Sequence, residues 1–552
     1  MQSTFPFLIL MLILLMSCKN EPTNSSATEE SATTTHTAQL KSETIQKHLS
    51  ELSSDAYEGR MPCTQGGIKT YKYLETEMKK LGLKAANEGS YLQSVPLLTV
   101  ESEIRPEMVI DYGSKKLTWA KSKDFIIHSE RTDPSVALVE SELVFCGYGI
   151  VDKKKGWNDY AGIDMKGKTA VILINDPGFG GDDPEFFNGD IMTYSGRWDY
   201  KYDIVDKMGA AGLLIIHETS SAGYPWFVIQ SSWTGPQQGL SGVDRSQDCG
   251  IKGWIHLDKA VELFAQAGLD FTTEVKAARN TGFKPKPLGA KVTMGVDNTH
   301  QECVSYNVAG YIPGTKYPDE YIIYTAHWDH IGIGKVVEGD SIYNGALDNA
   351  SGVSTLLAMA EAFKSLPTPP ERSVVFLLVT AEEQGLLGSE YYVENPFFPL
   401  DKTVCNLNMD GVNPIGEMKD LTITGKGHSE MDKIAETAAN KQDRYVIAEQ
   451  EPEKGYFFRS DHFNFAKKGV PALYAEGSYD HKTKGKEYAK EFKDKFINER
   501  YHAPADEYDP SEWIMEGMLQ DGALYFDIGQ TLANSRVWPK WYPESEFSRK
   551  KS

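Results

Sequence analysis

The second half of the chain alternates between apolar runs of strand length and segments with helical spacing. Residues 321–325 and 374–379 are almost continuously apolar, which is typical of strands that are covered on both faces. Between them, the segment 351–366 places apolar residues on one helical face, at Val353, Leu356, Leu357, Ala360 and Phe363. Shorter strand-like runs follow at 406–409 and 472–475. The pattern predicts an α/β fold, with a mixed sheet sandwiched by helices.

The first half of the chain has a different pattern and is predicted to contain an inserted domain. The spacing over 44–83 predicts helix, and Gly82 stands where a helix terminator is expected. From residue 132 onward, strand-like runs, turn-rich segments and one helical stretch at 199–211 form a β-rich block, which Pro285-Lys286-Pro287 closes as a linker. The predicted boundaries are 41–131 and 289–552 for the two parts of the main domain, and 132–288 for the insert.

The N-terminal residues predict export and a lipid anchor. Residues 5–16 are an apolar run that is too short to span a bilayer but long enough for a signal-peptide core. The run ends in Leu15-Met16-Ser17-Cys18, which resembles the bacterial lipobox. We therefore expect a lipoprotein signal peptide at 1–17, a lipidated Cys18 and a disordered tether at 18–40. The expected location is the bacterial cell envelope, facing the periplasm or at the cell surface; an uncleaved anchor and a plain signal peptide are the alternatives.

Charge and cysteine content narrow the possible partners. The formal net charge is −21 over 552 residues, which argues against nucleic acid or an anionic membrane face, because phosphate binding requires clustered Lys and Arg. Contact with the membrane is expected only through Cys18. The six cysteines are scattered, without the spacing of a metal knuckle or a dense disulfide framework. With Cys18 lipidated, at least one of the other five is unpaired, and we expect most of them to be small buried residues. Nothing in the pattern indicates an oligomeric state.

Acidic residues and histidines gather where the predicted strands end. The residues that follow the strands, or precede the helix at 351–366, are His327, Asp329, Asp348, Glu382, Glu383 and Asp410. Because ligands bind at the carboxyl ends of strands in open α/β sheets, we expect these side chains to converge at one edge. So many carboxylates without Lys or Arg would repel one another unless cations held them together. Imidazole and carboxylate without thiolate favour zinc or another divalent first-row ion.

The residues resemble the motifs of the co-catalytic zinc peptidases of the M28 family, which includes bacterial leucyl-type aminopeptidases and glutamate carboxypeptidases. The resemblance covers about residues 55–541, and the metal-site motifs stand in the family's order. The motifs are Ala326-His327-Trp328-Asp329-His330, Asp348-Asn349-Ala350-Ser351-Gly352, Ala381-Glu382-Glu383-Gln384-Gly385, Met409-Asp410, Arg459-Ser460-Asp461-His462 and Tyr501-His502-Ala503-Pro504-Ala505-Asp506-Glu507. The fold it implies is of the zinc-exopeptidase type.

The resemblance also implies a role for each residue of the site. His327 and Asp410 bind one zinc ion, Glu383 and His502 bind the other, and Asp348 bridges the two. Glu382 is the general base and then the general acid, while Asp329 fixes the tautomer of His327. The peptide bond between Asp348 and Asn349 is expected to be cis. The implied reaction releases N-terminal amino acids from peptides by attack of a hydroxide that bridges two zinc ions.

The insert resembles the protease-associated domain that many of these enzymes carry before the first metal ligand. The segments that carry this resemblance are 145–150, 160–168 and 210–216. The resemblance implies that the insert walls one side of the active-site cleft; a purely structural role is the alternative. Asp182, Asp183 and Asp190 offer a weaker pattern of a calcium loop, which an ordinary acidic surface loop would also explain.

Three other functions remain open. A carboxypeptidase of the glutamate-carboxypeptidase branch uses the same metals but recognises a terminal carboxylate, for which Arg459, Arg197 and Arg245 are the candidates. A non-catalytic, receptor-like ectodomain keeps the fold and loses the ligands, and the glutaminyl-cyclase branch uses a single zinc ion. Near the site, His330, Asp461 and His462 are as well explained by a structural role as by a supporting one.

Overall fold

The computed structural model describes residues 40–545, 547 and 548. The predicted signal peptide 1–17, the lipidation site Cys18 and all but the last residue of the tether 18–40 therefore lie outside the described residues. Within the part of the chain that the structure describes, no helix combines the length and the apolar character needed to cross a membrane.

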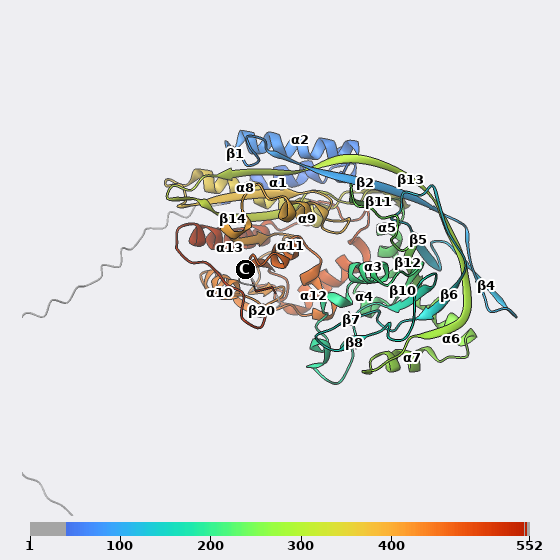
Figure 1. The fold of residues 1–552 in the computed structure, drawn as a ribbon. Coiled ribbons are helices and arrows are strands. Elements are labelled where there is room, and N and C mark those ends of the chain that lie inside the picture. Colours follow the sequence, from blue (N-terminus) through green and yellow to red (C-terminus); the bar gives the residue numbers. More distant parts are fainter. Residues whose placement is uncertain (1–39, 546, 549–552) are drawn as a thin grey trace, which may run out of the picture. The chain divides into compact units, whose positions relative to one another are not determined.

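A mixed sheet forms the centre of the main domain (Figure 1). Its strands in spatial order are β13 (Lys286–Ile312), β17 (Arg372–Val379), β14 (Tyr317–His327), β18 (Thr403–Asn408) and β21 (Ala472–Glu476). β14 runs parallel to β17 and β18, and β18 runs parallel to β21, whereas β13 is antiparallel to β17. Every residue of β17 and of β18 is buried, so the prediction of strands covered on both faces is confirmed.

Helices cover both faces of this sheet. On one face lie α1 (Ser42–Leu52), α8 (Ser351–Ser365) and α13 (Met515–Ala533), whose apolar side chains share one core with Ile322 and Tyr324 of β14. On the other face, Tyr392 of α9 (Leu387–Glu394) and Phe465 of α11 (His462–Lys467) share a core with Ile323. The predicted fold class, a mixed sheet sandwiched by helices, is confirmed.

The segment predicted as helix over 44–83 is broken in the middle. α1 ends at Leu52, a short 3-10 segment η1 (Asp55–Arg60) follows, and α2 (Gln65–Lys80) begins after a turn. Gly59 has a φ of 64°, and a Cβ there would lie 2.6 Å from the carbonyl oxygen of Gly332. Only glycine allows this left-handed turn so close to another segment, and the turn interrupts the helix. Gly82, with a φ of 66°, lies just beyond the end of α2 as predicted.

Two long strands connect the main domain to the insert. β13 spans 27 residues, and β2 (Leu92–Ile104) pairs with it from the contact of Val308 with Leu92 to that of Val296 with Ile104. Pro285-Lys286-Pro287 was predicted as a linker, but β13 begins at Lys286, and the strand continues into the insert (Figure 1). The described residues form one compact unit.

The insert has its own hydrophobic core, and its strands continue the sheet of the main domain, because β6 pairs with the long strand β13. This part of the sheet has four neighbouring parallel strands followed by one antiparallel strand: β6 (Ser135–Phe145), β9 (Thr169–Leu173), β10 (Gly212–His217), β12 (Ile251–His256) and β5 (Phe125–His128). Its hydrophobic core extends from Ile104 to Val296. The predicted boundary at residue 132 leaves β5 in the main domain, whereas β5 pairs with β12 and packs into the core of the insert.

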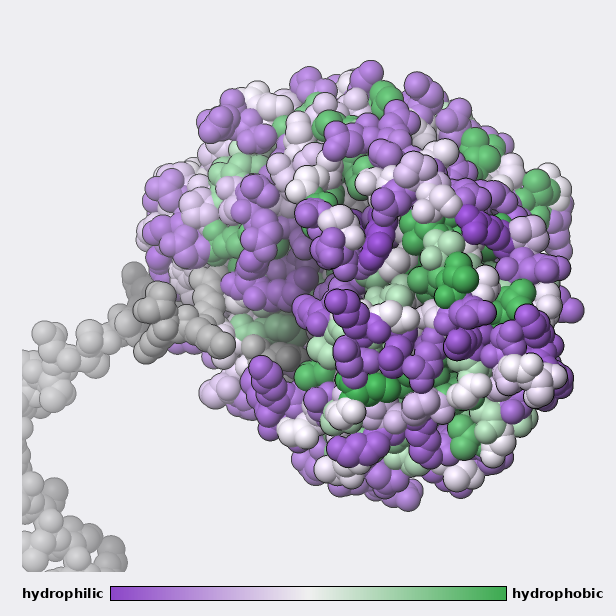
Figure 2. Space-filling model, turned by 45° about the vertical axis from the view of Figure 1, so that its right-hand side comes forward, coloured by the Kyte–Doolittle hydropathy of each residue, from purple (hydrophilic) through white to green (hydrophobic). Residues whose placement is uncertain are grey.

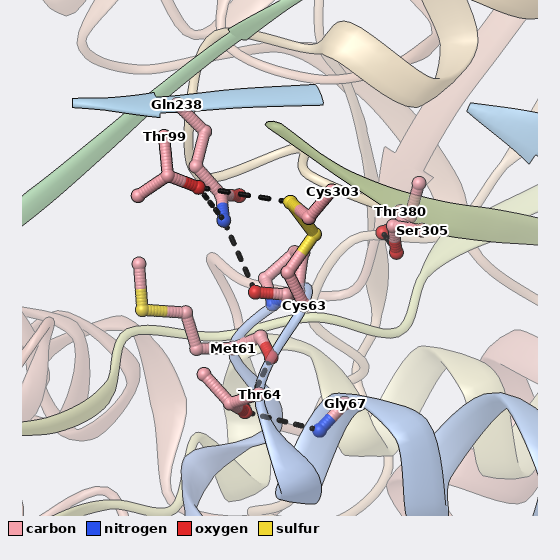
Figure 3. Close-up of a disulfide and its surroundings, with 10 residues drawn as sticks. Met61, Cys63, Thr64, Gly67, Thr99, Gln238, Cys303, Ser305 and Thr380 are labelled. Atoms are coloured by element: carbon pink, nitrogen blue, oxygen red, sulfur yellow. Dashed lines mark hydrogen bonds between the residues drawn. A yellow bond between two sulfur atoms is a disulfide. The ribbon is translucent and has the colours of Figure 1, made fainter. Parts of the chain in front are cut away.

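Two of the cysteines form a disulfide that the spacing did not indicate. Cys63, just before α2, is bonded to Cys303 in the middle of β13 (Figure 3). The two residues are 240 positions apart, so only the fold brings them together. Cys146, Cys249 and Cys405 are buried and free, as expected of small buried residues.

On the face shown in Figure 2, hydrophilic residues predominate and hydrophobic residues occur in small groups. This face therefore presents no broad apolar surface of the kind that marks a docking site for another protein.

Candidate metal centre

The strand ends of the central sheet carry the site. His327 is the last residue of β14, Glu382 and Glu383 follow β17, and Asp410 follows β18. Because β14 is parallel to both of its neighbours, the three strands end at the same edge of the sheet. The predicted convergence of these residues is therefore present in the fold.

Asp348 approaches the same point from the turn before α8. It lies in the segment η4 (Ala346–Ala350), and its peptide bond to Asn349 is cis, as the family resemblance implies. Gly345 has a φ of 54°, and a Cβ there would lie 2.4 Å from the ring of His330. Only glycine allows the backbone to pass so close to that ring.

The Asp348 carboxylate stands between the two histidines. Its Oδ1 lies 3.2 Å from Nε2 of His327, and its Oδ2 lies 3.5 Å from Nε2 of His502. Each histidine has a second carboxylate nearby: Asp410 Oδ1 is 3.0 Å from His327 Nε2, and Glu383 Oε2 is 3.0 Å from His502 Nε2. The arrangement offers two imidazole–carboxylate pairs on either side of one shared carboxylate.

This donor set fits divalent metal ions. The ligand atoms of His327, Asp348 and Glu383 lie within 4.8 Å of one another, and so do those of His327, Glu382 and Asp410. His502 Nε2 is buried and faces two carboxylates without well-formed hydrogen-bond geometry to a described residue, which suits a nitrogen that binds a metal. Imidazole with carboxylate is the ligand chemistry of catalytic zinc sites.

The electrostatics of the site separate the two adjacent glutamates. Burial, together with the charges of Asp410 and Glu383, raises the pKa of Glu382 well above its ordinary value, against the lowering effect of His327. Burial alone would also raise the pKa of Glu383, but His502 and His330 lower it to about 2. Glu382 is 3.9 Å from His327 Nε2, farther than the carboxylate of Asp410. The two neighbours therefore have different environments.

Asp329 supports the site differently from what the resemblance implies. The Nδ1 of His327 lies 3.2 Å from the main-chain oxygen of Asp329 and 3.9 Å from its carboxylate. The carboxylate instead accepts the backbone N–H groups of Glu382 and Glu383, at 3.1 and 3.3 Å. Asp329 thus holds His327 through its backbone and the two glutamates through its side chain.

The surroundings of His330, Asp461 and His462 differ, although a structural and a supporting role explained all three equally well in the sequence. His330 Nδ1 donates to Glu383 Oε1 at 2.6 Å, so His330 supports a predicted ligand. His462 is fully buried, its ring contacts Phe457 and Tyr474, and burial lowers its pKa to about 3. Asp461 is also fully buried, and burial raises its pKa to about 7. His462 therefore belongs to the packing behind the site, whereas the charge of Asp461 acts on the site and contributes to the raised pKa of Glu382.

Two supporting residues were not assigned from the sequence. Asp506 accepts the backbone N–H groups of Leu347 and Asp348, each at 3.0 Å. Arg60 is buried and donates to the main-chain oxygens of Trp328, Asn344 and Gly345. Asp506 stands four residues after His502 within a family motif, which was a usable signal. Arg60 lies in a turn whose position only the fold reveals.

The insert contributes one wall of the site. A cavity of about 790 Å³ extends from the predicted ligands into the insert. Its lining from the insert includes Arg197, Tyr224, Ser232 and Trp233. The Ser232 hydroxyl lies 2.8 Å from Nδ1 of His502, so the insert contacts a predicted metal ligand directly.

The mixed α/β sheet thus brings imidazole and carboxylate groups together at the carboxyl ends of its strands, within reach of a shared metal site. Residues 307–526 match the model of peptidase family M28. The matched part of the chain contains every predicted metal ligand.

Relatives with curated names align over parts of their length. Aminopeptidase NAALADL1 of Mus musculus is 34% identical over 137 residues, 23% of this chain and 17% of that protein. Aminopeptidase YwaD of Bacillus subtilis is 38% identical over 99 residues, 18% of this chain and 19% of that protein. Carboxypeptidase Q of Homo sapiens is 27% identical over 207 residues, 37% of each chain. The matches thus span well under two thirds of these relatives.

A solved structure matches over nearly the whole fold. The aminopeptidase from Aneurinibacillus sp. strain AM-1 superposes with a TM-score of 0.53 and 18% sequence identity, covering 91% of this chain and 96% of that chain. The comparison therefore extends the likeness in fold beyond the family match, to the insert as well as the catalytic sheet.

Proposed function

We propose that the protein is a two-zinc exopeptidase that removes N-terminal amino acids from peptides. The observation that carries the proposal is the placement of the Asp348 carboxylate, with one oxygen toward His327 and the other toward His502. One metal ion would need only His327, Asp410 and a single oxygen of Asp348. A carboxylate directed to two histidines is suited to a pair of ions.

The ligand assignments follow from this arrangement. His327 and Asp410 would hold one zinc ion, His502 and Glu383 the other, and Asp348 both. A non-catalytic ectodomain has no use for such a set, whose members come from five separate segments of the chain. A cyclase with one zinc ion would not need a second imidazole–carboxylate pair.

Glu382 is the remaining carboxylate and is placed for proton transfer. Bound zinc ions would polarise the carbonyl of the scissile bond and lower the pKa of the attacking water. Glu382 accepts the proton from that water and passes it to the leaving amine. The carboxylate of Asp329 accepts the backbone N–H group of Glu382 and so fixes the position of Glu382. The walls of the cavity limit the access of bulk water.

An N-terminal specificity is supported by carboxylates in the cavity. Glu449 and Glu476 both line the cavity, and Oε2 of Glu449 is buried without a hydrogen-bond partner among the described residues. These groups are available to bind the free ammonium group of a peptide. The names of two of the relatives, both aminopeptidases, point the same way.

One observation favours the carboxypeptidase alternative. Arg197 lines the cavity, is only 8% exposed, and has no charged partner nearer than Asp199, at 3.7 Å. Arg459 is already engaged, because it donates to main-chain oxygens of Ala222 and Lys454. Arg245 faces Glu130 and Asp248. Arg197 is therefore the guanidinium best placed to bind a carboxylate of the substrate.

Blocked dipeptides separate the two alternatives. We expect acetylation of the amine to reduce kcat/KM at least about tenfold, because loss of one charged contact of this kind costs 1.4 kcal/mol or more. Amidation of the carboxylate should change the rate little. The reverse pattern would assign the chain to the carboxypeptidase branch and make Arg197 the first residue to mutate.

The location of the enzyme is proposed from the N-terminal residues alone. Lipidation of Cys18 after cleavage at residue 17 would anchor it in the bacterial cell envelope, and several acyl chains are needed because one gives only marginal membrane affinity. A fatty-acid analogue should label the full-length protein and not Cys18→Ala, while the released variant keeps its peptidase activity. Label retained by Cys18→Ala would contradict the anchor.

A further inference from the structure

A serine of the insert contacts one predicted metal ligand. Ser232 is the last residue of α5 (Trp226–Ser232), and its Oγ lies 2.8 Å from Nδ1 of His502, which is 270 positions away in the chain. Among the described residues, Ser232 is the hydrogen-bond partner of Nδ1. The other ring nitrogen, Nε2, faces Glu383 and Asp348.

The hydrogen bond selects the nitrogen that is free to bind a metal. A neutral imidazole carries its proton on one nitrogen and a lone pair on the other. When Nδ1–H donates to Ser232 Oγ, the lone pair stands on Nε2, on the side of the two carboxylates. Partners of this kind fix the tautomer and orientation of metal-bound histidines.

Nothing else in the described surroundings of His502 supplies that constraint. Its backbone φ is 53°, in the left-handed region that side chains rarely adopt. The ring of Tyr501 lies 4.0 Å from the His502 ring, and such a contact limits tilting without distinguishing one ring nitrogen from the other. The Ser232 hydroxyl is therefore the group that can distinguish Nδ1 from Nε2.

Ser232 is itself held in place by contacts between the insert and the main domain. The strand β11 (Pro236–Leu240) follows α5 and pairs with β2. Gln238 on β11 donates two hydrogen bonds to the main domain. Its backbone N–H donates to Gln384 Oε1 at 2.9 Å, and its side-chain amide donates to the main-chain oxygen of Pro62 at 3.0 Å. Figure 3 shows Gln238 beside Thr99 and the Cys63–Cys303 disulfide. The segment 226–240 is thus fastened next to the metal centre.

We propose that Ser232 is a positioning residue for His502, so that the insert completes one of the two metal sites. The inference rests on the proposed two-zinc function. In this proposal the insert lines the active-site cavity and also supports metal binding. The hydroxyl group of Ser232 supplies that support.

The test measures zinc affinity in the full-length protein. Zinc should be titrated against a chromophoric chelator for the wild type, Ser232→Ala, Ser232→Thr and Ser231→Ala. Loss of an outer contact to a metal-bound histidine weakens metal binding by roughly 10–100-fold. We therefore expect Ser232→Ala to lower the affinity for one of the two zinc ions by about that factor and to leave the affinity for the other unchanged.

Two matched variants separate positioning from damage to the helix. Threonine keeps the hydroxyl, so Ser232→Thr should restore most of the affinity. Ser231 stands beside Ser232 on α5, and its hydroxyl donates to main-chain oxygens of Phe227 and Val228, so Ser231→Ala should bind both ions like the wild type. In a His502→Ala background, adding Ser232→Ala should cause no further loss, because the contact is already absent.

The outcomes distinguish this inference from the proposed function. Wild-type protein that binds two zinc ions, with Ser232→Ala binding both equally well, would overturn the role of Ser232 and leave the function standing. Equal losses in Ser232→Ala, Ser232→Thr and Ser231→Ala would also overturn it, as damage to α5. Wild-type protein that binds fewer than two zinc ions would overturn both.

Discussion

The two histidines of the metal centre are held in different ways. His327 ends a central strand, and its Nδ1 contacts the main-chain oxygen of Asp329 two residues further along the same loop. His502 lies outside the sheet, in a left-handed backbone conformation, and its Nδ1 contacts Ser232 of the insert. One side of the centre is built by the catalytic sheet alone, whereas the other needs a distant part of the chain.

The difference follows from where each residue stands. The strand register fixes His327 relative to Asp410, since β14 and β18 are neighbouring parallel strands. No ladder of hydrogen bonds fixes His502, which follows the short segment η8 (Phe496–Arg500). The nearby Asp506 holds the turn that carries Asp348, so the His502 side is assembled from tertiary contacts. We therefore expect the His502 side to be the more easily disturbed.

The largest expected effect comes from the group that belongs to neither side. Glu382→Gln removes the proton acceptor, and proton transfer of this kind contributes roughly 10²–10⁴-fold to turnover. We expect kcat to fall by about that factor while two zinc ions remain bound, as measured by peptide hydrolysis and metal analysis. Loss of a zinc ion from Glu382→Gln would show that Glu382 is a ligand instead of the base.

The next largest effect separates the two sides directly. Asp410→Asn should lower the affinity for the zinc ion beside His327, and Glu383→Gln should lower the affinity for the zinc ion beside His502. Each loss should exceed the roughly 100-fold that follows from removing a residue that only contacts a ligand. Zinc titration of both variants, with the wild type as the reference, measures the two affinities. Variants that lost the same ion would contradict the division of the site into two sides.

Removal of the disulfide should lower the stability of the fold without altering the metal ligands. The double variant Cys63→Ser, Cys303→Ser removes a crosslink of a kind that typically stabilises by about 2–4 kcal/mol. We expect the free energy of unfolding to fall by that order, while the wild type and the variant bind two zinc ions equally under native conditions. Weaker binding of zinc by the variant would mean that the turn at residues 60–64 also supports the metal centre, through Arg60.

An effect on stability of similar size, but confined to acidic pH, is expected from the insert. Burial lowers the pKa of His217 to about 4, and its Nε2–H donates to the main-chain oxygen of Tyr224, just before α5. The unfolded pKa of histidine is about 6.5. Because the folded pKa is the lower one, the stability that His217 contributes is present above pH 6.5 and is lost as the pH falls toward 4. The full difference is on the order of 3 kcal/mol.

Comparison with His217→Gln measures this contribution. As the pH falls from 7 to 4.5, the free energy of unfolding of the wild type should decrease relative to that of the variant. Replacement of the exposed His300 by Gln is the control for loss of a histidine elsewhere. A constant difference between the wild type and His217→Gln over this range would remove the proposed acid sensitivity.

The contrast between His327 and His502 also explains which site residues could be predicted from the sequence. Apolar runs locate strands, and residues directly after parallel strands meet at one edge, so His327, Glu382 and Asp410 were predictable from spacing. His502 and its role came only from the family resemblance, because no periodicity places a loop residue beside a strand end. Ser232 and the Cys63–Cys303 pair carry no local signal, since each depends on segments more than 200 residues apart. The break in the helix over 44–83 arises from the close approach of Gly59 to another turn, which spacing does not reveal.

The most direct test of the two-sided metal centre is anomalous diffraction at the zinc absorption edge from crystals of the full-length enzyme grown with zinc. The account predicts two peaks of anomalous density at the site, one beside Nε2 of His327 and Asp410, the other beside Nε2 of His502 and Glu383, with the Asp348 carboxylate between them. A single peak at full occupancy, or a second peak away from His502, would contradict it.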